Sequence, residues 1–451
     1  MKKSTTYAMR IRAFLSKVLL TATALAPAAE ASAQSVVDII SKNPAYATCN
    51  YNIYPDTLMF ESTPPPRGKQ PFYISHYGRH GSRYISNRKG FDIPYLMMLH
   101  ADSLDELTPT GKRVLEEMKI IMADSEGQWG ELTDYGRQQI RLIARHMMER
   151  FPEVLGGNAT VTGVSTTTPR CLLSMGTTMM ELMQRNPQLQ ITISSSKRNM
   201  NYLNFQDMAL RKNYMTPEAR KVFDSYINKR QGNKRLMELL FLNPDIVDEV
   251  VDETQFNYYL MKMGLFQQNT HLYKNTFLTS LFTTEELHRM WQMDNALWYI
   301  QHGACKLNGG LQPYSQRHLL RQLIADADSC LRLDKPGAQL RFGHETVLLP
   351  LVCLIGIDGY DLETDDLDDL EPKGWWSSSV FPMASNVQFV FYRSNPNDKD
   401  VLVKVLLNEK ETTLPLPSNR APYYRWTDLR RYCLKKLRQY DKRKQGAKSQ
   451  K

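Results

Sequence analysis

Three short apolar segments, each followed at once by ionisable residues and then by a helical pattern, constrain the fold of this chain more than any other feature. We expect buried strands at 70–75, 159–166 and 338–342, where apolar or β-branched residues predominate. The ionisable residues that follow these strands are Arg79, His80, Arg83, Arg170, His344 and Glu345. In an open α/β sheet the ligand lies beyond the carboxyl ends of the strands. The sequence therefore predicts an α/β fold in which these side chains converge on one crevice.

The rest of the chain predicts helices around the sheet and a helical insertion. The segment 131–151 has the apolar spacing of an amphipathic helix, and 170–185 continues the second strand as a helix. Two further strands are expected at 386–393 and 401–409. The expected units are an α/β domain formed by 34–174 and 336–430, an inserted α-helical domain at 175–335, and a basic C-terminal helix or tail at 431–451.

The two ends of the chain differ from its body in charge and composition. Residues 1–33 carry basic residues, a short apolar stretch and a final Ala-Ser-Ala, which predicts a secretory signal peptide cleaved after Ala33. We expect a bacterial protein that is periplasmic or secreted and has no transmembrane segment. Residues 430–451 hold ten Lys or Arg against Asp441 alone, and the body before them is slightly acidic. No nucleic-acid partner is therefore expected; the tail is expected to be solvated, with contact to an anionic surface as the alternative.

The predicted crevice has the composition of a phosphate site. The guanidinium groups of Arg79, Arg83 and Arg170 are planar charged forks that match phosphate oxygens. Their positive charge lowers the pKa of His80, which keeps the imidazole neutral and nucleophilic. Glu345 can donate a proton to a departing alkoxide. The expected chemistry is attack by His80 on phosphorus, a phosphohistidine intermediate and its hydrolysis, without metal or other cofactor because the arginines supply the charge.

Three motifs carry a family resemblance. "RHGSR" at 79–83, "STTTPRCLLS" at 165–174 and "FGHETVLLPL" at 342–351 resemble the signatures of the histidine phosphatase superfamily, in its acid phosphatase and phytase branch. "LTDYGRQQ" at 132–139 and "ASNVQFVFYR" at 384–393 are similar to the same branch. Within it, the chain looks closest to bacterial multiple inositol polyphosphate phosphatases.

The resemblance implies a fold, an activity and residue roles. The implied fold is a phosphoglycerate-mutase-like mixed sheet flanked by helices, with an inserted α-helical lobe. The implied substrate is a small-molecule phosphomonoester, an inositol polyphosphate such as phytate. The implied roles are His80 as nucleophile, Arg79, Arg83, Arg170 and His344 as phosphate ligands, and Glu345 as proton donor. The chain departs from the usual His-Ala-Glu of the inositol polyphosphate group, because here the acid directly follows His344 and Thr346 comes next.

Other interpretations stay open from the sequence. An acid phosphatase of broader specificity would act on sugar phosphates such as glucose 1-phosphate, and a catalytically inactive protein would only bind phosphate. Arg88 and Lys89 either contact further phosphates of the substrate or lie in a solvated loop. His76 and His80 have the spacing of a metal-binding pair, but Gly78 disfavours the helix that such a pair needs.

Six cysteines in an exported chain permit disulfides. Cys171 and Cys353 lie within apolar helical patterns, so we expect buried thiols at both positions. Cys305 and Cys330 lie at the ends of two successive helical segments, and we expect them to pair.

Overall fold

The computed structural model describes residues 35–55, 62–273 and 276–449 of the chain. The predicted signal peptide at 1–33 lies outside these residues. The described part forms an eight-stranded sheet with the order β3-β2-β4-β1-β5-β6-β7, and β8 pairs with β6. The strands are β1 (Gln70–Arg79), β2 (Thr160–Ser165), β3 (Gln190–Ser195), β4 (Gly337–Gly343), β5 (Asn386–Arg393), β6 (Leu402–Leu407), β7 (Lys410–Glu411) and β8 (Tyr423–Arg425). In the same ranges, no helix has the length and apolar character to span a membrane.

The sheet is mixed, and its parallel strands end at one edge. Strands β3, β2, β4 and β1 run parallel, whereas β5 is antiparallel to β1 and β6 is antiparallel to β5. The register places Arg79 of β1 opposite Gly343 of β4, and Ser165 of β2 opposite Phe342. Strand β1 runs beyond the predicted segment 70–75 because β4 and β5 pair with it on both sides. The predicted α/β class is confirmed, and the three predicted strand ends meet at one edge.

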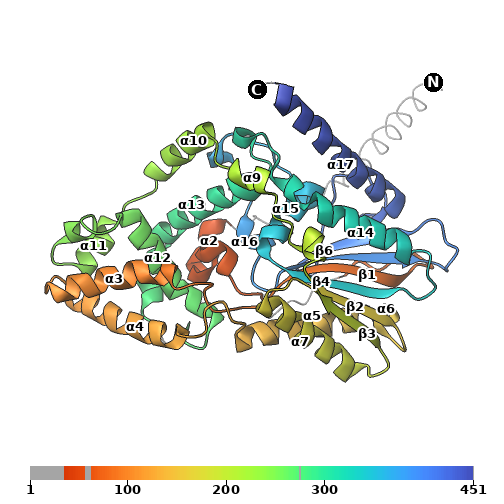
Figure 1. Cartoon of the computed structure of the whole chain (residues 1–451), viewed down its shortest axis with the longest axis horizontal. Coiled ribbons are helices and arrows are strands. Elements are labelled where there is room, and N and C mark those ends of the chain that lie inside the picture. Colours follow the sequence, from red (N-terminus) through yellow and green to blue (C-terminus); the bar gives the residue numbers. More distant parts are fainter. Residues whose placement is uncertain (1–34, 56–61, 274–275, 450–451) are drawn as a thin grey trace, which may run out of the picture.

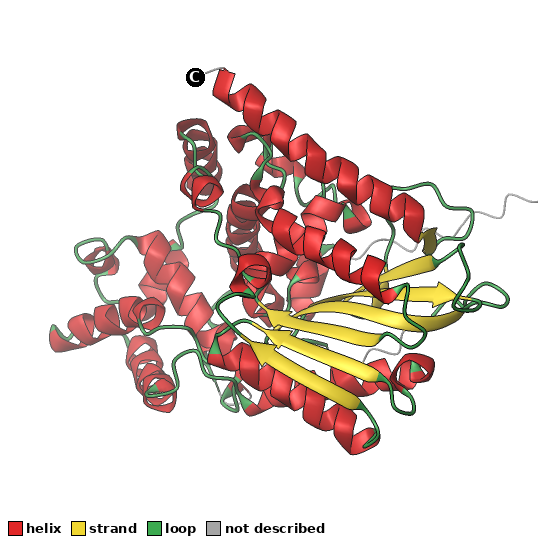
Figure 2. Cartoon of the chain, turned by 45° about the vertical axis from the view of Figure 1, so that its right-hand side comes forward, coloured by secondary structure: helices red, strands yellow, loops and turns green. Residues whose placement is uncertain are grey.

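Helices cover both faces of this sheet (Figures 1 and 2). One face is covered by α5 (Asp134–Arg150), α6 (Pro152–Leu155) and α7 (Pro169–Arg185), whose apolar side chains form one buried cluster with the strands. The other face is covered by α14 (Arg317–Cys330), α15 (Glu345–Ile355) and α17 (Trp426–Ser449). Their core continues without a break into the helical lobe, since Leu320 and Leu348 belong to the same buried cluster as Leu260 and Trp291. This shared core ties the lobe to the sheet.

The helical lobe draws on two insertions. The first follows β1 and contains α3 (Lys89–Ser103) and α4 (Pro109–Ser125). The second follows β3, and its longer helices are α10 (Pro217–Asn228), α11 (Lys234–Leu240), α12 (Glu253–Leu265) and α13 (Thr284–His302). The predicted insertion at 175–335 thus covers only part of the lobe, which Figure 1 shows beside the sheet.

Two elements within 175–335 belong to the sheet side of the molecule. Residues 190–195 form the edge strand β3, which sequence reasoning assigned to the helical insertion. This strand pairs only with β2 and most of its side chains are exposed, so it lacks the apolar run of a buried strand. The helix α14, also predicted within the insertion, lies over the sheet in Figure 1.

The predicted disulfide is wrong. All six cysteines are buried and free, including Cys171 and Cys353 as predicted. Cys330 ends α14, where its sulfur accepts a weak hydrogen bond from Gln339. Cys305 lies between α13 and the short helix η6 (Lys306–Asn308), and helix succession along the chain did not bring the two thiols together.

The basic C-terminal segment is a helix that is anchored at its start. In α17, Arg430 forms an ion pair with Asp328 of α14 at 2.8 Å, and Lys436 pairs with Asp361 at 3.1 Å. Leu437 and Tyr440 are buried against the core. The expectation of a solvated tail from residue 431 onward is therefore wrong for residues 431–440, which pack on the sheet domain.

Candidate active site

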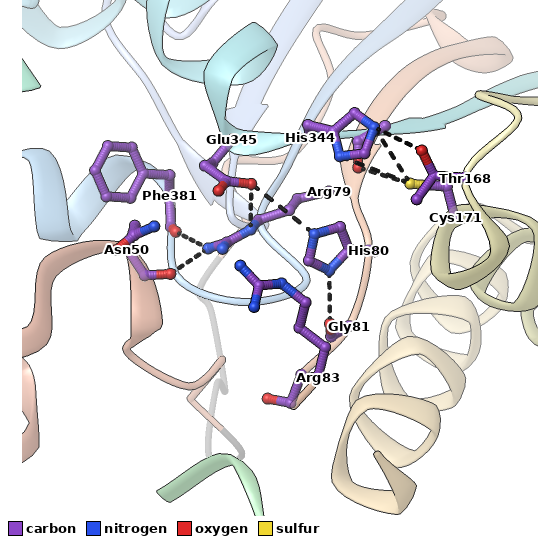
Figure 3. Close-up of polar contacts among 12 residues, drawn as sticks. Asn50, Arg79, His80, Gly81, Arg83, Thr168, Cys171, His344, Glu345 and Phe381 are labelled. Carbon is purple, nitrogen blue, oxygen red and sulfur yellow. Dashed lines mark hydrogen bonds and ion pairs between the residues drawn. The ribbon is translucent and has the colours of Figure 1, made fainter. Parts of the chain in front are cut away.

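The predicted side chains lie at the edge of the sheet where β1, β2 and β4 end, and Figure 3 shows Arg79, His80, Arg83, His344 and Glu345 there. Arg79 is the last residue of β1, and the loop after it carries His80 and Arg83. Arg170 lies in the first turn of α7, and Glu345 is the first residue of α15. Helix N-termini expose unpaired N–H groups, and both of these point at the same cluster. The structure therefore brings together all six side chains that the strand ends predicted.

Arg79 is fully buried and held by carbonyl oxygens. Its Nη1 donates to the carbonyl of Asn50 at 2.5 Å and to that of Phe381 at 2.7 Å, and its Nε lies 3.1 Å from Oε2 of Glu345. Burial lowers the pKa of Arg79 to about 10, a change that the nearby Glu345 carboxylate opposes. The guanidinium stays charged at neutral pH in a fixed orientation.

His80 has one ring nitrogen bonded and one free. Its Nδ1 lies 2.8 Å from the carbonyl oxygen of Gly81, which can only accept a hydrogen bond, so Nδ1 carries the proton. Its Nε2 lies 3.9 Å from Oε2 of Glu345. Burial, followed by the charge of Arg79, lowers the pKa of His80 well below its usual value. The ring is therefore neutral, and the lone pair of Nε2 faces the cluster.

Several buried nitrogen atoms in this cluster lack a hydrogen-bond partner among the described residues. They are Nε and Nη2 of Arg79, Nε2 of His80, Nε of Arg83 and Nε of Arg170, of which Nε of Arg79 faces the Glu345 carboxylate at 3.1 Å. Buried polar groups are almost always paired in folded proteins. Four of the five belong to guanidinium groups, whose fixed charge and fork geometry match the oxygens of an anion.

His344 and Arg83 complete the walls of the cluster. His344 lies with its ring edge toward His80, at 5.8 Å between ring centroids, and its Nε2 shares a hydrogen bond with the hydroxyl of Thr166 at 3.3 Å. Burial lowers the pKa of His344 to about 4. Arg83 donates from Nη1 to the carbonyl of Tyr84 at 2.9 Å, and its guanidinium lies over the ring of Tyr51. Among the described residues, neither Arg83 nor His344 forms an ion pair with a carboxylate.

Glu345 is ionised in the free protein. Burial raises its pKa, but the charges of Arg79 and Arg83 outweigh this effect and hold the pKa below its usual range. The sequence predicted a carboxylic acid that is protonated at mildly acidic pH. The structure shows instead that the carboxyl can hold a proton only when something offsets the charge of the arginines.

The same cluster contains the atoms that could in principle bind a metal. One ligand atom each from His80, His344 and Glu345 lie within 4.8 Å of one another. However, Nε of Arg79 lies 3.1 Å from the carboxylate, and burial, together with the charges of Arg79 and Arg170, lowers the pKa of both histidines. A site with this much fixed positive charge favours an anion over a cation. That the protein uses no metal stays a prediction.

Arg88 and Lys89, the predicted specificity residues, lie on the surface at the start of α3. Arg88 is half exposed and forms ion pairs with Asp92 at 2.7 Å and Glu126 at 3.3 Å. Lys89 is exposed. Both acids that Arg88 contacts belong to the helical lobe, so its charge is directed there and not toward His80.

A pocket of about 250 Å³ next to Glu345 contains residues that sequence reasoning missed. Its walls include Phe205, Gln206, Asp207, Arg211, Tyr214, Trp298, Gln301, His302, Gln312, Ser315, Gln316 and Thr346. His302 is the last residue of α13, and burial lowers its pKa to about 4, with Glu345 opposing and Arg211 adding to the effect. These side chains come from separate segments of the chain, so no spacing in the sequence joins them.

Comparisons with known proteins show the family and the fold of the chain. A family model described as histidine phosphatase superfamily (branch 2) matches residues 78–408. The structure is similar to that of Bifidobacterium longum multiple inositol polyphosphate phosphatase in complex with inositol hexasulfate, at 16% identity and a TM-score of 0.70, covering 85% of this chain and 96% of that chain. It is also similar to the phytase from D. castellii, at 15% identity and a TM-score of 0.67, covering 87% and 85% of the two chains. A search of curated proteins gave no match.

Proposed function

We propose that this chain, which belongs to the histidine phosphatase superfamily (branch 2), hydrolyses phosphomonoesters of inositol polyphosphates through a phosphohistidine intermediate. The observation that carries the proposal is the set of buried guanidinium and imidazole nitrogens that lack partners at the ends of β1, β2 and β4. The guanidinium nitrogens can donate to the oxygens of a phosphoryl group, and the unprotonated Nε2 of His80 can face its phosphorus.

In the proposed ground state the phosphoryl oxygens replace the missing partners of the cluster. Arg79, Arg83, Arg170 and His344 hold them, and the N-termini of α7 and α15 add backbone N–H groups. Nε2 of His80 then faces phosphorus with its lone pair, since its proton is on Nδ1. No reorganisation of Arg79 is needed, because Asn50 and Phe381 already fix its orientation.

In the first chemical step, the bond from Nε2 of His80 to phosphorus forms as the bond from phosphorus to the ester oxygen breaks. Glu345 gives its proton to the departing alkoxide. The bound phosphate dianion offsets the arginines that keep the pKa of Glu345 low in the free protein, so the carboxyl binds a proton together with the substrate. In the second step Glu345 accepts a proton from water, the oxygen of that water bonds to phosphorus, and His80 leaves.

The pocket next to Glu345 supports an extended, phosphorylated leaving group. Thr346 forms part of its wall, so the pocket adjoins the place where the ester oxygen departs. Arg211 offers a guanidinium to a further phosphate, and its acidic neighbour Asp207 is already paired with Arg317 at 2.6 Å. The similar structure from Bifidobacterium longum contains inositol hexasulfate, which supports the same class of ligand for this chain. We further propose that the protein is exported, on the strength of the signal-like residues 1–33.

One observation favours a second candidate, a phosphatase for smaller esters such as glucose 1-phosphate. Arg211 is the one Lys or Arg among the residues that line the described pocket, whereas phytate carries many charged groups. Initial rates of phosphate release from phytate, glucose 1-phosphate and p-nitrophenyl phosphate distinguish the two functions. Slow release from phytate and fast release from the simple esters would refute the inositol polyphosphate assignment. Loss of turnover in His80→Ala, with retained binding of inorganic phosphate, is expected in either case; surviving activity would refute the covalent mechanism.

A further inference from the structure

The loop that carries His80 is held by polar side chains from three different elements. Gln139 of α5 accepts from the backbone N–H of Ser82 at 3.0 Å, and Ser174 of α7 accepts from that of Gly81 at 3.2 Å. The third contact comes from the helical lobe, where the hydroxyl of Ser82 donates to Oδ1 of Asn269 at 2.7 Å. Asn269 ends the short helix η3 (Phe266–Asn269) and is fully buried. The catalytic loop is thus tied to both lobes.

Asn269 also contacts the segment that supports Arg79 and Arg83. Its Nδ2 donates to the carbonyls of Tyr51 at 2.9 Å and Phe266 at 3.0 Å. The residue before Tyr51 is Asn50, whose carbonyl accepts from Nη1 of Arg79 at 2.5 Å. The ring of Tyr51 itself lies under the guanidinium of Arg83, at 5.5 Å. One amide therefore connects the loop of His80 with the segment that supports both arginines.

On the side that faces α5, the loop of Gly81 and Ser82 has no space to move. A Cβ atom added at Gly81 would lie 2.4 Å from the carbonyl oxygen of Gly136, and one at Gly136 would lie 2.1 Å from that of Ser82. Backbone of α5 thus presses on the loop, and the side chain of Asn269 meets it from the helical lobe. Because α5 blocks one side, removal of the contact with Asn269 leaves the helical lobe as the direction in which the loop can shift, against the remaining bonds to Gln139 and Ser174.

We propose that Asn269 is a positioning residue that sets the distance between His80 and the arginines of the cluster, an inference that rests on the proposed phosphatase function. Its amide satisfies one hydroxyl and two carbonyls at once, so no other polar side chain of similar size offers the same set of bonds. A displacement of about 1 Å between reacting groups costs up to about 100-fold in rate. The expected consequence of losing Asn269 is therefore a fall in kcat on every substrate, including small ones that never reach the pocket of Arg211.

The test uses Ser82→Ala, Asn269→Ala and the double variant of the full chain. Asn186→Ala is the matched control, because Nδ2 of Asn186 also donates to two carbonyls, those of Leu155 at 2.9 Å and Gly157 at 2.8 Å. Asn186 follows α7 at its far end, about 24 Å along the helix from Pro169. Turnover of p-nitrophenyl phosphate, the dissociation constant of inorganic phosphate and the thermal midpoint are measured for each protein.

We expect kcat to fall about 10-fold to 100-fold in both single variants and not in Asn186→Ala. Because Ser82 and Asn269 act through one hydrogen bond, the double variant should be no slower than the slower single variant. Multiplying losses in the double variant, or kcat within threefold of the parent in both single variants, would overturn the proposal. Ser82→Ala removes one hydroxyl, so it remains informative if Asn269→Ala fails to fold. If the parent protein has no turnover, the proposed function is refuted separately, and the positioning role is then judged on phosphate binding, which should weaken at least fivefold in both single variants and not in the control.

Discussion

Replacing Glu345 with glutamine tests the two effects proposed for this side chain, proton donation and competition with substrate for Arg79. The amide has nearly the same shape but no charge and no acidic proton. In the free protein Oε2 lies 3.1 Å from Nε of Arg79 and 3.9 Å from Nε2 of His80. A phosphorus atom poised for attack lies about 3.5 Å from the nucleophilic nitrogen. A bound phosphate is therefore only a few ångströms from the carboxylate that this substitution removes.

The two effects have opposite signs. Two unit charges about 6 Å apart interact by about 3 kcal/mol at an effective dielectric constant of about 20. Removing the carboxylate relieves a repulsion of this size at pH 7, so Glu345→Gln should bind inorganic phosphate up to about 100-fold more tightly than the parent. Loss of the general acid should lower kcat on alkyl phosphates by about 100-fold to 10,000-fold. Esters with good leaving groups, such as p-nitrophenyl phosphate, need little protonation and should lose much less.

Calorimetric titration with phosphate at pH 7 and steady-state rates on both ester types measure these changes. Asp92→Asn is the matched control, since it also removes a carboxylate from an arginine pair, the one with Arg88 at 2.7 Å on the surface. Equal losses on good and poor leaving groups would take Glu345 out of the acid role. Unchanged or weaker phosphate binding would refute the electrostatic reasoning, because Arg79 would then not be shared between the carboxylate and the ligand.

Three further predictions concern the pocket, the buried side chain of His76 and the thiols. Arg211→Ala should raise the KM for phytate about 10-fold and leave the KM for p-nitrophenyl phosphate unchanged. Arg88→Ala should change neither KM, because Arg88 pairs with surface acids. The reverse pattern would assign specificity to Arg88. Burial and the charge of Arg341 lower the pKa of His76 to about 3, so the unfolded chain binds a proton there below about pH 6.5 and the folded chain does not. The free energy of unfolding should therefore fall as the pH drops from 6.5 toward 3. Between pH 6.5 and 4.5, denaturant titrations should show a fall in this free energy that is up to about 3 kcal/mol smaller in His76→Leu than in the parent. An equal fall in both proteins would refute the assignment. All six cysteines are free, so a reductant should leave the thermal midpoint unchanged, and six thiols should react only after denaturation.

The position of the proposed catalytic cluster could be predicted from the sequence because short-range rules place each of its members. Parallel strands share an edge, so residues that directly follow β1, β2 and β4 must meet there, whatever the helices do. Arg79, His80 and Glu345 needed only this rule and the family motifs. The ionisation of Glu345 did not follow, because it depends on a distance of 3.1 Å to Arg79 that no spacing encodes.

The supports of the cluster lay beyond sequence reasoning for a different reason. Asn269 and Ser82 are 187 residues apart, and Arg211 lies far along the chain from His302 and Thr346. Their contacts depend on how the helical lobe packs on the sheet, which is a property of the shared core and not of any local pattern. The edge strand β3 was missed because Ile191 and Ile193 alternate with polar residues and form no continuous apolar run like that of a buried strand.

The arginines of this protein differ in what holds them, and this difference separates those that can bind a ligand from those that cannot. Arg88 on the surface faces two carboxylates, which cancel its charge. Arg83 in the cluster is held by the carbonyl of Tyr84, and Arg79 by two carbonyls and one carboxylate. Carbonyl oxygens fix a guanidinium without neutralising it, so the charge stays available to an anion. Of the six side chains of the cluster, Glu345 is the carboxylate, and under the proposed mechanism the incoming phosphate would favour its protonation. Binding of substrate would then both release Arg79 from the carboxylate and protonate Glu345, which would couple binding of the phosphoryl group to readiness for cleavage.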